Sequence, residues 1–176
     1  MRLLSEHDTE RATRADGELA ELPPTVSVSV AVEADPHEVY ALLVDLDAMS
    51  ALTEETESMT WSEPVDEPRV GAVFQGANRQ GRRTWSTTCT VTDADPCRRF
   101  AFEVTALGGR VPVARWQYDV QWSTSGCQVT ESTWDRRPSW FKGPATLVTG
   151  VRDRAEASRR HMELTLGRVR DRLERR

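Results

Sequence analysis

The stretch Thr25-Val-Ser-Val-Ser-Val-Ala-Val-Glu-Ala-Asp-Pro-His-Glu-Val-Tyr-Ala-Leu-Leu43 decides the first step of the fold. Up to Val32, valines alternate with small residues, which is the two-residue period of a half-buried strand. A helix start follows, because Asp35 can cap, Pro36 suits the first helical position and Glu38 completes a capping box. The stretch therefore predicts a strand that runs directly into a short helix, with a second short helical turn after it.

The residues that follow this opening carry β signals without interruption. Strands are predicted over 58–63, 72–79, 82–93, 98–106, 113–123 and 127–135. Turn residues such as Gln80-Gly81, Asp95-Pro96 and Ser125-Gly126 separate them by hairpin-length connections. We therefore expect an antiparallel meander of about six strands, or about seven with the first strand.

The C-terminal part changes to a helical period. Apolar or small residues recur in steps of three and four, at Leu147, Val151, Ala155, Ser158, Met162, Leu166, Val169 and Leu173. We expect one continuous helix over 144–173, a rod of roughly 45 Å that needs a concave surface to cover its apolar stripe. Gly150 costs about 1 kcal/mol relative to Ala inside a helix, so a bend or a close backbone approach is expected there.

Composition limits the class of protein. The chain has 176 residues, a net charge of −5 and a pI of about 5.3, which suits one domain and disfavours nucleic-acid binding. No window reaches the ~18 apolar residues of a membrane span, and acidic residues interrupt the start before a signal-peptide core forms. Three cysteines without a CxxC motif indicate free thiols and a cytoplasmic location. Residues 1–24 are predicted to be a flexible acidic tail and residues 25–176 the domain.

This order of elements resembles the START-like (SRPBCC) superfamily, in particular its polyketide cyclase/dehydrase and lipid-binding branch. The likeness rests on the stretches 30–43, 69–79, 85–91 and 150–154, within about residues 25–173. It implies an α+β helix-grip fold, a curved antiparallel sheet of about seven strands around a long C-terminal helix. It also implies a cavity for a hydrophobic ligand, since relatives bind lipids, quinones, hormones and polyketides, and only some of them catalyse a reaction.

Alternation along the strands predicts which side chains face that cavity. The inward set also includes Trp122 on its strand and Leu147 on the last helix. The predicted ligand-binding residues are Phe74, Asn78, Trp85, Thr87, Phe102, Trp116, Tyr118, Glu131, Val151 and Ala155. An aromatic lining with a few polar groups is typical of a small-molecule pocket, although the same side chains could simply fill a core.

Glu131 is the most informative of these residues. A carboxylate that faces inward in mid-strand has to be paired, hydrogen-bonded or neutral. Arg152, Arg154 or Arg159 of the last helix could pair with it, which would make Glu131 a structural link. Alternatively Glu131, with Tyr118, is a polar anchor or a catalytic acid/base.

Three classes of function stay open. The first is a binding protein for a hydrophobic, aromatic, polyketide-like or lipid-like small molecule, and the second is an aromatase/cyclase-type enzyme that uses the same cavity. The third is a protein-interaction module that uses the acidic N-terminal part. The sequence contains no explicit catalytic motif, and we expect neither a cofactor nor a metal. The sequence does not decide the oligomeric state, and a homodimer is one possibility.

Overall fold

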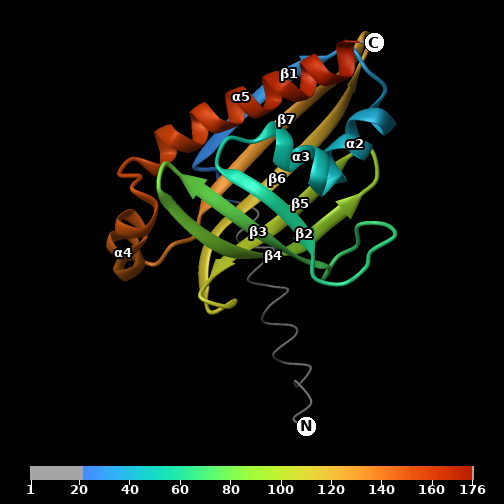
Figure 1. Cartoon of the computed structure of the whole chain (residues 1–176). Coiled ribbons are helices and arrows are strands. Elements are labelled where there is room, and N and C mark those ends of the chain that lie inside the picture. Colours follow the sequence, from blue (N-terminus) through green and yellow to red (C-terminus); the bar gives the residue numbers. More distant parts are fainter. Residues whose placement is uncertain (1–21, 176) are drawn as a thin grey trace.

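The computed structural model describes residues 22–175 and has an α+β architecture (Figure 1). Most of the tail predicted over 1–24 therefore lies outside the described residues. In chain order the elements are β1 (Val26–Val32), α2 (Pro36–Val44), α3 (Leu46–Leu52), β2 (Thr56–Trp61), β3 (Val73–Gln80), β4 (Arg83–Asp95), β5 (Arg99–Ala106), β6 (Val111–Ser123), β7 (Gly126–Asp135), α4 (Ser139–Thr149) and α5 (Arg154–Glu174).

The seven strands form one antiparallel sheet in the order β1-β7-β6-β5-β4-β3-β2. Every pair from β2 to β7 is a hairpin neighbour, and only β1 pairs out of sequence, with β7. In Figure 1 α5 runs across the sheet beside β1, while α2 and α3 lie near the end of the sheet where the C-terminus is found. The predicted helix-grip fold is confirmed.

The strand, the Asp35 cap and the two short helices of the opening stretch form as the sequence indicates. The Asp35 side chain accepts a hydrogen bond of 2.8 Å from the backbone N–H of His37, and Pro36 occupies the first turn of α2. Asp45 ends α2 and caps α3 by accepting from the backbone N–H of Ala48 at 3.0 Å. The apolar faces of both helices enter the core, and their buried members include Val39, Leu42, Leu43, Leu46 and Met49.

The prediction of one continuous helix over 144–173 is wrong, because the chain breaks at Gly150–Asp153. Gly150 ends α4 in the left-handed conformation, with φ +77°. The Asp153 side chain then accepts from the backbone N–H of Glu156 at 3.0 Å and begins α5. A glycine stop followed by an Asp-x-x-Glu start is a helix boundary that the apolar period alone conceals. The bend expected at Gly150 is confirmed as a full break.

Candidate ligand cavity

A cavity of about 1150 Å³ lies between the sheet and the helices α3, α4 and α5. The strands β3 to β7 supply most of its wall, and α5 and α4 contribute side chains from the other side. Aromatic rings dominate the part that the sheet supplies. They are Phe74, Trp85, Phe100, Phe102, Trp116 and Tyr118. A concave site of this size with apolar walls is large enough to enclose a small organic molecule.

Nine of the ten side chains predicted to face the cavity lie in its lining. These are Phe74, Asn78, Trp85, Thr87, Phe102, Trp116, Tyr118, Glu131 and Ala155. The tenth, Val151, is buried but does not belong to the lining. Strand alternation was sufficient for the eight of these that lie on strands, because β3 to β7 stay regular there and the bulge in β4 falls later, at Val91–Asp93.

Two side chains expected to be covered on the inner face are exposed. Trp122 is 76% exposed because it lies at the end of β6, beside the turn into β7. Leu147 is 78% exposed because α4 does not continue the line of α5. Both errors arise at places where an element extends beyond the partner that would have covered it.

Tyr118 and Glu131 form a buried pair inside the cavity wall. They lie directly opposite each other on β6 and β7, and the Tyr118 hydroxyl donates to Glu131 Oε1 at 2.8 Å. The second carboxyl oxygen of Glu131, Oε2, is buried and has no hydrogen-bond partner among the described residues. Burial raises the pKa of Glu131 to about 7, although the hydrogen bond from Tyr118 lowers it. Burial also raises the pKa of Tyr118, and the Glu131 charge adds to this shift.

The expected link between Glu131 and an arginine of the last helix is therefore wrong. Arg154 instead makes a bidentate pair with Glu55, with both N···O distances at 2.7 Å. His161 lies 3.8 Å from the Glu55 carboxylate and 3.7 Å from that of Glu54. These four residues line the cavity where α5 meets the connection between α3 and β2. Sequence analysis missed Glu54 and Glu55, whose only signal is a pair of acids just before a strand.

A second polar group lies on the wall formed by β2, β3 and β4. Asn78 accepts a hydrogen bond from the Thr56 hydroxyl at 3.0 Å, and its amide N–H donates to Thr87 Oγ1 at 3.2 Å. A Cβ atom at Gly76 would come within 2.8 Å of Thr87 Oγ1, so only glycine allows this close approach. The cavity thus has an amide–hydroxyl group on one wall and a carboxyl–phenol pair on another.

Three further observations on residues 22–175 concern metal-type clusters, membrane-spanning helices and cysteines. Among residues 22–175 there is no cluster of three or more His, Cys, Asp and Glu side chains arranged for a metal ion. Over the same residues, no helix is long and apolar enough to cross a membrane. All three cysteines are free, as predicted. Cys89 is buried, which raises the pKa of its thiol to about 12, whereas Cys97 is half-buried with Sγ 3.0 Å from His37 Nδ1.

The gripped helix and the cavity beside it are the arrangement of a START-like (SRPBCC) fold. The chain belongs to the family described as polyketide cyclase/dehydrase and lipid transport, whose model matches residues 23–174. This confirms the resemblance proposed from the sequence. No match was found among curated proteins.

Solved structures of similar fold include proteins named for polyketide chemistry. A polyketide cyclase-like protein, Cgl2372 of Corynebacterium glutamicum, is 27% identical, with a TM-score of 0.58 over 86% of this chain and 93% of its own. The di-domain aromatase/cyclase BexL of the BE-7585A pathway is 18% identical, with a TM-score of 0.64 over 96% of this chain and 60% of its own. StfQ, the di-domain aromatase/cyclase of the steffimycin pathway, is 14% identical, with a TM-score of 0.58 over 85% of this chain and 44% of its own. At these identities BexL and StfQ support the fold alone.

Proposed function

We propose that this protein binds a hydrophobic small molecule, aromatic, polyketide-like or lipid-like, in the cavity between the sheet and α5. The observation that supports this most is the cavity itself, about 1150 Å³ with a mainly apolar and aromatic wall. A packed core of the same fold would fill that volume with side chains, since protein interiors leave few voids larger than a water molecule. Family membership points the same way.

In this proposal Glu131 and Tyr118 orient the ligand. In an apolar wall the neutral carboxylic acid is favoured over the carboxylate, so Glu131 Oε2 would donate a hydrogen bond to a ligand oxygen once the carboxyl group turns toward the cavity. Tyr118 holds the other carboxyl oxygen and fixes the direction of the group. Phe74, Trp85, Phe102 and Trp116 would contact the ligand through their rings, and Asn78, Thr87 and Ala155 would complete the contact surface.

A titration with the fluorescent probe 1-anilinonaphthalene-8-sulfonate tests the binding proposal. The wild-type protein should bind one probe molecule with enhanced emission. Ser158 is buried on α5 and lines the cavity, so Ser158→Phe should fill part of the volume and weaken binding at least tenfold. Ser29→Phe, an exposed position on β1, is the matched control and should bind as the wild type does. Equal binding by the wild type and Ser158→Phe would contradict the proposal.

The second candidate function is an aromatase/cyclase-type reaction in the same cavity. The buried, unpartnered Oε2 of Glu131 favours it, because a carboxyl group with a pKa of about 7 can both donate and accept a proton near neutral pH. Glu131 would assist enolisation, aldol closure or loss of water from a poly-ketone chain, and Tyr118 would hold its carboxyl group in position. Formation of aromatic product from a linear poly-ketone, followed by absorbance, should fall at least a hundredfold in Glu131→Gln.

The cellular location and the oligomeric state of the protein are also matters of proposal. Three free thiols and the absence of a membrane-spanning helix among residues 22–175 support a cytoplasmic protein. Whether two copies associate is a separate question, which sedimentation velocity would answer. A single species at the monomer mass would contradict the homodimer.

A further inference from the structure

The helix α4 exposes three of its large apolar side chains. Of its eleven residues only Ala145 is buried, while Trp140 is 64%, Leu147 78% and Val148 50% exposed. An amphipathic helix on a globular protein normally turns its apolar face to the core. An apolar helix face that is exposed beside a cavity indicates an interaction surface, where another molecule or a membrane covers the apolar side chains.

The exposed apolar residues lie around the mouth of the cavity. Trp140 and Val148 of α4 line the cavity, and so does Leu107 from the loop between β5 and β6. Leu107 is 65% exposed and has φ +52°, a conformation that non-glycine residues rarely adopt. Together with Leu147, these residues are called the apolar rim below. The rim therefore combines two segments far apart in the sequence.

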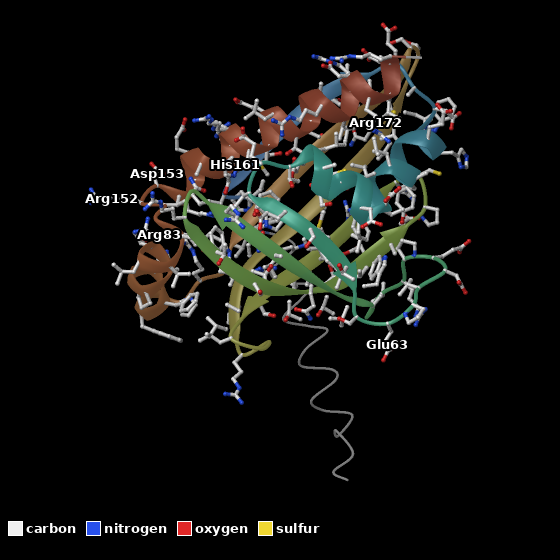
Figure 2. All side chains as sticks on the ribbon, in the orientation of Figure 1. Glu63, Arg83, Arg152, Asp153, His161 and Arg172 are labelled. Atoms are coloured by element: carbon white, nitrogen blue, oxygen red, sulfur yellow. The ribbon has the colours of Figure 1, made fainter. Side chains whose placement is uncertain are left out.

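Arginines without carboxylate partners accompany the apolar rim. Arg82 and Arg83 lie at the turn between β3 and β4, Arg110 follows Leu107, and Arg152 lies between α4 and α5. All four are exposed, and no carboxylate among the described residues forms an ion pair with them. Figure 2 shows Arg83 and Arg152 beside the end of the molecule that carries α4.

The local charge is opposite to that of the whole protein. Residues 136–152 contain four Lys or Arg and no Asp or Glu, although the full chain has a net charge of −5. Three of these cations are already paired, Arg136 with Glu103 and both Arg137 and Lys142 with Asp135. Asp153, the nearest acid to Arg152 in sequence, caps α5. Within residues 136–152 this leaves Arg152 as the one cation without a carboxylate partner, and it is exposed, like Arg82, Arg83 and Arg110 near the rim.

We propose that the apolar rim and its four arginines dock the mouth of the cavity on the surface of an anionic lipid bilayer. Apolar side chains on a short helix insert between lipid headgroups, and arginines around them attract anionic lipids. A second copy of this chain fits the surface less well. A symmetric dimer through the rim would bring two sets of four unpaired arginines together.

Cosedimentation of the full chain with lipid vesicles tests the proposal. Vesicles of mixed phosphatidylcholine and phosphatidylglycerol should bind the protein, and pure phosphatidylcholine vesicles should bind it at least tenfold more weakly. Added salt should weaken the binding to mixed vesicles. Arg82→Gln combined with Arg83→Gln should reduce the partition coefficient by roughly tenfold or more, and Leu147→Ser should reduce it by about tenfold.

Matched control variants are available elsewhere on the surface. Trp122 and Val70 are 76% and 66% exposed but lie outside the rim. Trp122→Ala should bind vesicles as the wild type does, whereas Trp140→Ala should bind more weakly. Val70→Ser is the corresponding control for Leu147→Ser.

Failure of this proposal can be told apart from failure of the proposed function. Leu147, Arg82 and Arg83 do not line the cavity, so their variants should bind 1-anilinonaphthalene-8-sulfonate as the wild type does in the absence of vesicles. Absence of binding to mixed vesicles, or equal binding by the rim variants and the wild type, would overturn the docking proposal. A dimer in sedimentation velocity that Leu147→Ser dissociates would assign the rim to a second copy and also overturn it.

Discussion

The helices α4 and α5 continue the same apolar period in the sequence, yet they meet opposite environments. In α5 the stripe is buried, and Met162, Leu166 and Val169 are each 1% exposed or less. In α4 Trp140, Leu147 and Val148 are exposed, Leu147 to 78%, and Phe141 is half-buried. The difference shows that an apolar stripe predicts burial only as far as a sheet lies beneath it. The sheet supports α5 along β1 and β7, whereas α4 lies beyond this support at the open side of the cavity.

The largest expected effect separates the two helices directly. Leu166→Ala should lower the free energy of unfolding by about 2–5 kcal/mol, because it removes a fully buried side chain from the core. Leu147→Ala should change the same quantity by less than about 0.5 kcal/mol. Urea unfolding at pH 7 measures both. A loss above about 2 kcal/mol in Leu147→Ala would mean that α4 packs on the domain and would break the comparison.

Glu131, which is buried in the cavity wall, should make the free energy of unfolding depend on pH. Its carboxyl group has a folded pKa of about 7 against an ordinary value of 4.5. The folded state therefore holds the proton more tightly, and stability falls as pH rises from about 4.5 to about 7. The loss is about 3 kcal/mol.

Glu131→Gln cannot ionise, so it should lack this loss. Relative to the wild type, the variant should gain about 3 kcal/mol between pH 4.5 and pH 8 in urea unfolding. Removing the phenol in Tyr118→Phe also removes the hydrogen bond that lowers the pKa of Glu131. In that variant the pH-dependent loss of unfolding free energy should continue to a higher pH than in the wild type. Identical pH profiles for Glu131→Gln and the wild type would contradict the burial of this carboxyl group.

The boundary between the two helices should respond to substitution at its glycine. Gly150→Ala places a side chain at φ +77°, which costs about 1–2 kcal/mol, and its Cβ would meet the end of the Arg83 side chain at 2.5 Å. Gly167 lies inside α5 with open space around its Cβ position. Gly167→Ala is therefore the control and should stabilise the protein by about 0.5–1 kcal/mol. Stabilisation by Gly150→Ala would indicate one continuous helix in solution.

Regular pairing explains how much of the fold could be predicted. The strands from 72 to 135 are joined by hairpins, so local alternation and turn residues were sufficient for their order and for residues such as Phe74, Thr87 and Tyr118. At Gly150 a bend was predicted but not a full break, because a three-four period counts apolar positions and does not register a left-handed residue between two caps.

The partners of charged side chains could not be predicted from the sequence. Alternation gave the face of Glu131 but not the residue opposite it, which is set by the register of β6 against β7. The Glu55–Arg154 pair joins residues 99 positions apart, and it depends on where α5 crosses the connection after α3. These contacts follow from the three-dimensional arrangement, which no local pattern contains.

The smallest expected effect is a difference in reactivity among the three thiols, which does not involve the free energy of unfolding. Cys97 is half-buried in the turn between β4 and β5, whereas Cys89 and Cys127 are buried. A thiol reagent under native conditions should modify Cys97 first. Cys89 should react last, because burial raises its pKa to about 12 and little thiolate forms. Mass spectrometry of the digested protein measures the order, and early labelling of Cys89 would mean that the inner face of β4 is open.

Native mass spectrometry of the full chain, purified from its own host without detergent, tests the central claim most directly. The account predicts one retained hydrophobic molecule per chain in the wild type, and its loss in Ser158→Phe, because the cavity of about 1150 Å³ would then be partly filled. The thermal midpoints of both proteins, measured in parallel, establish that the variant is folded. A wild-type protein that carries no ligand and does not bind the fluorescent probe, or a folded Ser158→Phe variant that retains the same ligand, would contradict the account.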